Sequence, residues 1–195
     1  MSTPAPSRFP VPTLSELPED IRARIEKVQE KAGFVPNVFI VLAHRPDEFR
    51  AFFAYHDALM LRQGALTKAE KEMIVVATSA ANRCLYCIVA HGAILRAYSK
   101  KPLLADQVAG NYLKADLSPR ERAILDFAMK VALEADRVEE GDFAPLRAHG
   151  LSDEDVWDVG AIAAFFALSN RMANLSNMMP NPEFYPLGRV PRSKT

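Results

Sequence analysis

The chain of 195 residues has no excess of either charge, only 8 glycines and only 2 cysteines. Lysine and arginine number 24, and aspartate and glutamate also number 24, so the formal net charge is zero. Without a basic excess, the chain lacks the electrostatic footprint of nucleic-acid binding or of attachment to an anionic membrane. No glycine-rich loop is present to cradle a phosphate, and no serine stands in a nucleophile elbow. We therefore expect neither a nucleic-acid nor a membrane partner.

Long hydrophobic runs are also missing. Apolar runs such as 73–77 and 161–168 fall well short of the roughly 20 residues that cross a bilayer. The first 20 residues contain prolines and acids, and no basic region followed by an apolar core, so we expect a cytoplasmic protein without a secretory signal. Thiols are kept reduced in that compartment, and two cysteines three positions apart rarely form a static bridge. The cysteine pair therefore needs another explanation.

The distribution of proline predicts an all-α domain between two irregular tails. Nine of the 14 prolines lie in residues 1–18 and 180–195, whereas residues 47–179 contain only three and no Asn-Gly or Asp-Gly hairpin signal. A chain of this length buries roughly 70% of its unfolded surface, enough for one core without a metal or a disulfide. We expect a proline-rich arm at 1–17, a single helical domain at 18–179 and a proline-rich tail at 180–195. The tails are either mobile or extended as arms over the body or over a neighbouring subunit.

Nine helices are expected within the domain, and three of them have marked starts. Thr67, Ser118 and Ser152 each stand as an N-cap with an acid three residues later, where the hydroxyl accepts a backbone N–H and the acid favours the helix dipole. The expected ranges are 18–32, 37–44, 47–62, 67–82, 84–99, 102–110, 118–135, 140–148 and 152–178.

Both cysteines and a histidine stand in the segment Asn82-Arg-Cys84-Leu-Tyr-Cys87-Ile-Val-Ala-His91. On a helix, offsets of 0, 3 and 7 place the two thiols and the imidazole on one stripe. Cys87 and His91 then form an i, i+4 pair, and the two cysteines are close enough for a disulfide. A thiolate attacked by a peroxide becomes a sulfenic acid, which a second thiol one turn away condenses to a disulfide. The stripe can therefore store two electrons.

Glu72 is a fourth candidate, twelve positions before Cys84. On one straight helix the two would be about 18 Å apart, so Glu72 joins the thiols only if the chain turns between them. Asn82 and Arg83 are the candidate break. Cys84 would then start a new helix, where free N–H groups and the dipole favour its thiolate.

Three structural interpretations compete with a redox site. The Cys-x-x-Cys pair and His91 could bind zinc, although a structural zinc site takes four ligands and the chain has no second cysteine pair. Both cysteines could be small core side chains, and Glu72 could be an ordinary solvated helix residue. The other histidines lack partners at catalytic spacing and are expected at the surface or in caps: His44, His56 and His149. Four phenylalanines are expected in the core: Phe52, Phe53, Phe165 and Phe166.

Glu72 followed by eleven residues and then Cys84-x-x-Cys87-x-x-x-His91 resembles the signature of the alkylhydroperoxidase D family, in its peroxidase-related branch. The segments around Thr67 and 170–174 are similar too, so that the likeness covers about residues 15–180. The broader superfamily contains carboxymuconolactone decarboxylases, which share the all-helical fold and generally lack the cysteine pair. The resemblance implies an alkylhydroperoxidase D-like helical bundle.

The resemblance also implies a mechanism and partners. Cys87, assisted by His91, would attack a hydroperoxide, Cys84 would resolve the sulfenic acid and Glu72 would relay protons. Tyr86 departs from members that carry a histidine there, and a phenol is a poor base at neutral pH. No metal or haem cofactor is implied, the reductant would be a dithiol such as a dihydrolipoyl protein or a thioredoxin-like donor, and the chain would form a homo-oligomer. A non-redox lyase of the decarboxylase type and a redox-sensing module with little turnover remain alternatives.

Overall fold

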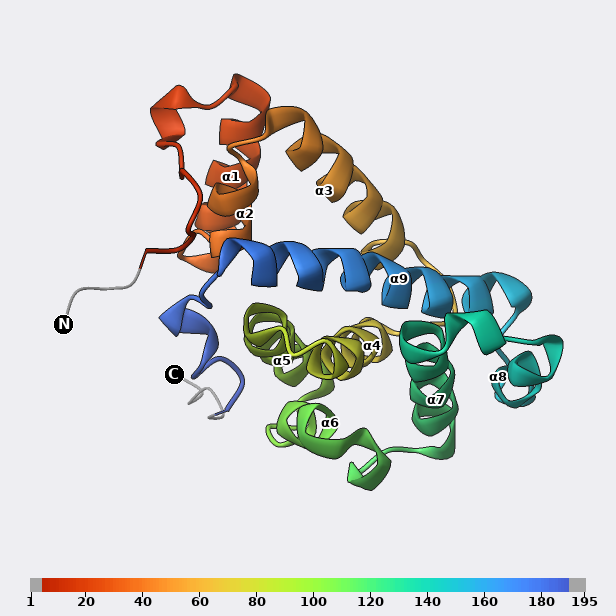
Figure 1. Cartoon of the computed structure of the whole chain (residues 1–195). Coiled ribbons are helices and arrows are strands. Elements are labelled where there is room, and N and C mark those ends of the chain that lie inside the picture. The colour runs from red at the N-terminus through yellow and green to blue at the C-terminus, as the bar shows by residue number, and fades with distance from the viewer. Residues whose placement is uncertain (1–4, 190–195) are drawn as a thin grey trace.

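A computed structural model of the chain describes residues 5–189 (Figure 1). The expected outermost parts of the two tails, 1–4 and 190–195, lie outside the described residues. Between them the chain forms helices and no strand, which confirms the all-α prediction. The helices are α1 (Glu19–Ala32), α2 (Asn37–Leu42), α3 (Pro46–Met60), α4 (Lys68–Ala81), α5 (Leu85–Ser99), α6 (Leu104–Asn111), α7 (Pro119–Leu133), α8 (Ala144–Ala148) and α9 (Asp153–Ser176).

Each of the nine expected helices is present, with ends that differ by a few residues. The largest difference is at 140–148, where a 3-10 turn at Glu140–Phe143 precedes the short helix α8. Thr67, Ser118 and Ser152 are N-caps, and each completes a capping box with the acid three residues later. The marked starts of α4, α7 and α9 are therefore confirmed.

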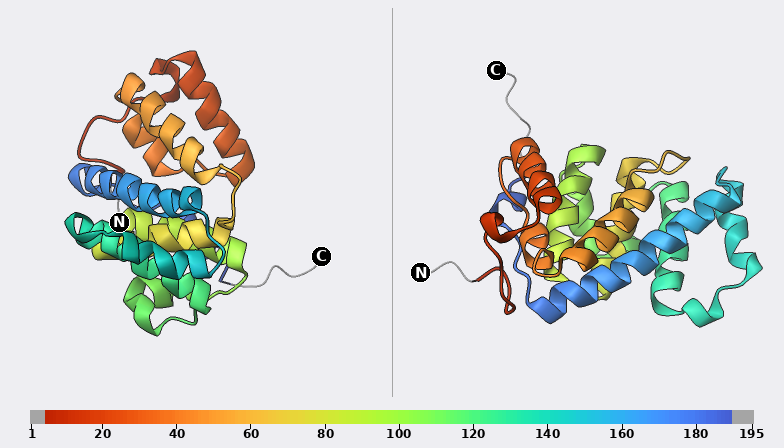
Figure 2. Two further views of the ribbon diagram at one scale, coloured as in Figure 1. Left: turned by 90° about the vertical axis from the view of Figure 1, so that its right-hand side faces the viewer. Right: turned by 90° about the horizontal axis from the view of Figure 1, so that it is seen from above.

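The longest helix, α9, runs through the middle of the molecule. Figures 1 and 2 show α1, α2 and α3 on one side of it and α4, α5, α6 and α7 on the other. Helix α4 packs against α5, α7 and α9, and its residues 73–79 are buried without interruption. A helix that is apolar on every side is normally enclosed by neighbours, as α4 is here. Glu72, which lies just before this stretch and is itself buried, is consequently held in the interior.

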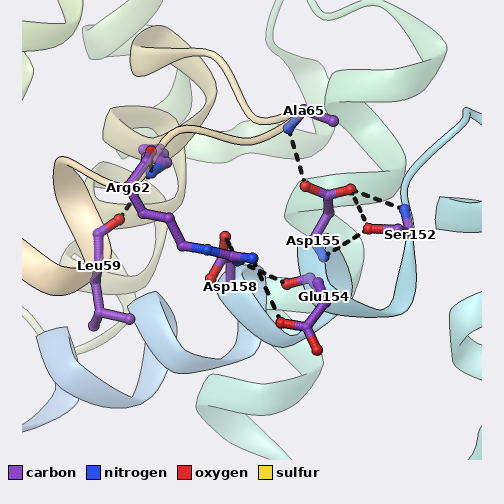
Figure 3. Close-up of polar contacts among 8 residues, drawn as sticks. Leu59, Arg62, Ala65, Ser152, Glu154, Asp155 and Asp158 are labelled. Carbon is purple, nitrogen blue, oxygen red and sulfur yellow. Dashed lines mark hydrogen bonds and ion pairs between the residues drawn. The ribbon is translucent and has the colours of Figure 1, made fainter.

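Ion pairs fix the loop between α3 and α4 to the start of α9 (Figure 3). Arg62 pairs with Asp158 and Glu154, and the backbone N–H of Ala65 donates to Asp155 at 3.0 Å. The buried Lys71 of α4 donates from Nζ to the carbonyl oxygens of Leu59, at the end of α3, and of Arg62, in the loop after it, each at 2.8 Å. These contacts set the position of α4 relative to α3 and α9.

The C-terminal segment lies across α5. Arg96, buried in α5, donates to the carbonyl oxygens of Phe184 and Leu187 at 3.0 and 2.8 Å. Gly188 has a φ of 73°, and a Cβ there would lie 2.7 Å from the Cβ of Arg96, so only glycine fits this close approach. Among the described residues no helix is long and apolar enough to cross a bilayer.

Candidate redox site

The chain breaks between α4 and α5 where the sequence predicts it. Helix α4 ends at Ala81, Arg83 adopts a φ of 53°, and α5 begins at Leu85. A positive φ at a non-glycine residue reverses the chain direction locally at a cost in backbone strain. The turn brings α5 back along α4, and the two helices form the most extensive pairing in the fold.

Cys84 occupies the N-cap of α5, and Cys87 lies in the first turn of the helix. Both thiols are free and fully buried. The backbone N–H of Cys87 points at Cys84 Sγ, 3.4 Å away. Cys84 therefore lies just outside the helix, and the stripe that helical spacing predicts applies strictly to Cys87 and His91. Their apolar surroundings include Val41, Tyr86, Ala93, Ala173, Met178 and Phe184.

This arrangement distinguishes the two thiols electrostatically. The thiol and backbone N–H of Cys87, the Asn170 amide and the charge of His91 lower the pKa of Cys84 from 9.0 to about 7, against the opposing effect of burial. The pKa of Cys87 is raised, because the neighbouring Cys84 sulfur and burial both disfavour a second negative charge. When the pair loses one proton, the thiolate is thus favoured at Cys84, hydrogen-bonded by a neutral Cys87.

Glu72 and His91 meet across the two helices. Glu72 Oε2 lies 2.7 Å from His91 Nδ1, and the exposed fractions of the two side chains are 8% and 14%. Since a carboxylate only accepts hydrogen bonds, Nδ1 carries the hydrogen and Nε2 is left unprotonated in the neutral ring. The structure therefore brings Glu72 into contact with the histidine, as the predicted break requires.

A second imidazole borders the same place. The rings of His91 and His56 both pack edge-on against Phe166, with centroid separations of 4.7 and 6.5 Å. His56 Nδ1 is 3.0 Å from Asp57 Oδ1, and Arg24 holds Asp57 through two hydrogen bonds of 2.9 and 3.0 Å. Burial, and to a smaller extent the charge of His91, lower the pKa of His56. His56, which the sequence places at the surface or in a cap, is thus half-buried within α3.

Asn170 of α9 links the site to the helix break. It is fully buried, accepts from Asn82 Nδ2 at 3.0 Å and donates to Ser79 Oγ at 2.9 Å. The Asn170 amide also lowers the pKa of both thiols. In the sequence, residues 170–174 stand out only through the family resemblance. An asparagine in an apolar helix could also have indicated a site residue, because a buried amide has to be hydrogen-bonded.

Tyr86, between the cysteines, is held away from proton transfer. Its hydroxyl oxygen accepts the backbone N–H of Val38 at 3.2 Å, and the side chain is buried. Burial raises the pKa of the phenol well above its usual value. Tyr86 therefore serves as a packing and hydrogen-bonding residue between α5 and α2.

A groove of about 480 Å³ opens between α3 and α9, near the aromatic side chains around His56. Phe52 and Phe165 line it, and Phe165 also packs against His56 with centroids 6.1 Å apart. These two rings are thus groove walls as well as core, whereas Phe53 and Phe166 are core alone. A larger hollow of about 840 Å³ lies over α7, α8 and α9. Neither space is lined by the thiols, Glu72 or His91.

Within residues 5–189 no group of three or more histidine, cysteine, aspartate and glutamate side chains is placed to hold a metal ion. Cys84 and Cys87 lie in an apolar cluster, and His91 is committed to Glu72 through Nδ1. The arrangement combines a thiol of lowered pKa, a second thiol next to it and a carboxylate-held imidazole. These groups can undergo dithiol chemistry and transfer protons.

Comparison with family models matches residues 46–108 to the carboxymuconolactone decarboxylase family. The chain is similar to an uncharacterised peroxidase-related protein from Ralstonia eutropha JMP134, whose structure is described as an alkylhydroperoxidase AhpD core. The two share 69% identity over 97% of this chain and 100% of the other, with a TM-score of 0.96. An uncharacterised peroxidase-related protein from Silicibacter sp. TM1040 shares 40% identity over 97% of this chain and 100% of its own, with a TM-score of 0.91.

A more distant structure, the debrominase Bmp8, shares 20% identity over 91% of this chain and 95% of its own, with a TM-score of 0.71. At that identity the likeness concerns the fold alone. Comparison with the curated proteins finds no match.

Proposed function

Because this chain belongs to the carboxymuconolactone decarboxylase superfamily, in its AhpD-like, peroxidase-related branch, we propose that it is a thiol-dependent hydroperoxide reductase. The observation that carries the proposal is the buried Cys84–Cys87 pair, with one thiol of lowered pKa, beside the Glu72–His91 hydrogen bond. A thiolate is the form that attacks a peroxide, and a thiol one turn away resolves the product before further oxidation.

The proposed cycle balances with two thiols and one hydroperoxide. A thiolate attacks the terminal oxygen, so that an S–O bond forms, the O–O bond breaks and an alcohol leaves after protonation. The second thiol then attacks the sulfenic acid, forming a disulfide and water. A dithiol donor, of the dihydrolipoyl or thioredoxin-like kind, restores the two thiols. A reducing cytoplasm would keep the pair ready for the next turn.

The family resemblance and the pKa shifts predict different cysteines as the one that attacks the hydroperoxide first. Resemblance implies first attack by Cys87 with help from His91, and this stays a prediction. The lowered pKa favours Cys84 as the thiolate instead. Trapping sulfenic acid with dimedone in Cys84→Ser and Cys87→Ser proteins decides between them: the variant that keeps the attacking cysteine forms the adduct.

The test of the function is peroxide consumption by the fully reduced protein. One equivalent of cumene hydroperoxide is expected to remove two thiols and release one equivalent of cumyl alcohol, with further consumption when a dithiol donor is supplied. Retention of both titratable thiols after exposure to peroxide would contradict the proposal. Consumption of one equivalent, with no donor in a panel supporting turnover, would instead identify a redox-sensing module.

The double substitution Cys84→Ser with Cys87→Ser separates the lyase alternative. A lyase that uses Glu72 and His91 for proton transfer would keep its activity in this variant, whereas a dithiol peroxidase would lose all of it. The homo-oligomer that the resemblance implies is a separate prediction, checked by light scattering at micromolar concentration.

A further inference from the structure

Two carboxylate-held imidazoles face the same phenylalanine ring. Glu72 holds Nδ1 of His91, Asp57 holds Nδ1 of His56, and both rings pack edge-on against Phe166. The two pairs come from different parts of the chain, since His56 and Asp57 are on α3 whereas Glu72 and His91 are on α4 and α5. Packing around Phe166 alone would not require that both histidines also be held by carboxylates.

The second ring nitrogens are left available. Among the described residues, neither His91 Nε2 nor His56 Nε2 has a hydrogen-bond partner, and the single buried side-chain nitrogen or oxygen without one is Arg24 Nε. Each Nε2 atom therefore keeps some solvent-accessible surface of its own. The side chain of His56 is 27% exposed and that of His91 14%, so His56 lies on the solvent side.

Asp57 fixes the tautomer of His56. The carboxylate accepts from Nδ1–H and is itself tied to Arg24, whose guanidinium lies 4.7 Å above the ring of Phe53. In the neutral ring the lone pair is consequently on Nε2, which acts as an acceptor. Burial, which lowers the pKa of His56, favours this neutral form at pH 7.

A hydroperoxide has one hydrogen-bond donor, its O–H, and an acceptor in its inner oxygen. We propose that His56 is a substrate-binding residue whose Nε2 accepts the O–H of the hydroperoxide and holds the terminal oxygen toward the attacking thiolate. This inference rests on the proposed peroxidase function and adds to it a residue that the sequence motif does not contain.

The two histidines then take complementary roles in one step. His91 Nε2 removes the proton from the thiol, and the thiolate attacks the terminal oxygen, which keeps its hydrogen and becomes the sulfenic acid. The O–O bond breaks with its electron pair on the inner oxygen, and that oxygen takes the proton from His91. The sulfur is oxidised by two electrons and the peroxide is reduced by two. His56 stays unprotonated and contributes by orientation.

Three variants test the role of His56. His56→Phe keeps an aromatic ring and removes the acceptor, His56→Gln keeps an acceptor, and His149→Phe changes an exposed histidine on another part of the surface. Each reduced protein is mixed in stopped flow with cumene hydroperoxide and, separately, with 4,4′-dithiodipyridine, which oxidises the same dithiol and has no O–H.

Removing the acceptor is expected to slow oxidation by the hydroperoxide about 10- to 100-fold in His56→Phe, in the range of a lost positioning or hydrogen-bonding group. The rate with dithiodipyridine should stay within about twofold of the wild type. His56→Gln should recover much of the hydroperoxide rate, and His149→Phe should match the wild type with both oxidants.

Each other result overturns the inference. Equal slowing with both oxidants in His56→Phe would mean that His56 only supports the packing around the thiols, and an unchanged hydroperoxide rate would mean that it does not contact substrate. If His56→Phe fails to fold, the same comparison in Asp57→Asn applies, where slowing must again be confined to the hydroperoxide. A wild-type protein that consumes no hydroperoxide would refute the proposed function itself.

Discussion

Replacement of Cys87 tests how the thiolate of Cys84 is stabilised. The largest contribution to the lowered pKa of Cys84 is the hydrogen bond from the Cys87 thiol, and the Cys87 backbone N–H adds to it at 3.4 Å. Cys87→Ala removes the thiol donor and leaves the backbone donor in place, whereas Cys87→Ser keeps a hydroxyl donor at the same position. The pair of variants therefore isolates a single hydrogen bond.

With its pKa lowered to about 7, Cys84 is half ionised at pH 7, whereas a pKa of 9.0 leaves about 1% thiolate. A hydrogen bond to a charged group contributes about 1.5 kcal/mol, and one pKa unit corresponds to 1.36 kcal/mol, so Cys87→Ala should raise the midpoint by about one unit. The thiolate fraction at pH 7 would then fall from about one half to about a tenth. Cys87→Ser should titrate close to the wild type.

Thiolate absorbance at 240 nm, followed between pH 5 and 10 on the reduced protein, measures this midpoint without requiring a reagent to enter the buried site. The midpoint is a better readout than an alkylation rate, because the nucleophilicity of a thiolate falls as its pKa falls. Cys84→Ser is the control and should show no ionisation near pH 7, since burial alone disfavours the Cys87 thiolate. A wild-type midpoint near 9, or equal midpoints in Cys87→Ala and Cys87→Ser, would refute the reasoning.

Three further outcomes are expected. Arg96→Ala leaves the carbonyl oxygens of Phe184 and Leu187 without their donor, so residues 184–189 should detach, limited proteolysis there should accelerate, and the free energy of unfolding should fall by about 1–3 kcal/mol. Asp155→Ala removes the capping box of α9 and the acceptor of the Ala65 N–H, which should destabilise the fold by about 1–3 kcal/mol in urea titrations while the 240 nm midpoint of Cys84 stays unchanged. His56 has a lowered pKa in the folded chain, so the unfolded chain binds its proton first as pH falls; stability should therefore decrease from about pH 7 to 5, and urea midpoints should show a smaller decrease in His56→Gln. An equal or larger decrease in that variant would contradict the assignment.

Local signals in the sequence were sufficient for the fold. Hydroxyl caps followed by an acid at three helix starts, and the confinement of most prolines to the two ends, are short-range features that hold whatever the tertiary structure is. The break at Asn82 and Arg83 followed from a different argument, because only a turn there could bring Glu72 to the thiols. The positive φ of Arg83 supplies that turn.

The surroundings of His56 could not be predicted, because the ring that it shares with His91 is distant in sequence. Its own segment, Phe52-Phe-Ala-Tyr-His56, resembles an ordinary amphipathic core stretch, and its carboxylate partner Asp57 is the adjacent residue rather than one at catalytic spacing. Phe166, which joins it to His91, is more than a hundred positions away. Neither hydrophobic periodicity nor residue spacing in a single sequence predicts that α3, α5 and α9 contact one another at this place.

Because the dithiol is buried, the two imidazoles would be the groups that bind a hydroperoxide on its way to the sulfur atoms. Cys84 and Cys87 have almost no exposed surface, so an oxidant has to leave bulk water before it reaches either sulfur, and the Nε2 atoms of His91 and His56 keep some accessible surface beside the site. A hydroperoxide can exchange its solvent hydrogen bonds for these two nitrogens before it meets sulfur, which reduces the cost of leaving water. An oxidant without a hydrogen-bond donor gains nothing from His56. Selectivity for hydroperoxides over other thiol oxidants would therefore reside in the carboxylate-held histidines, while the reactivity itself belongs to the cysteine pair.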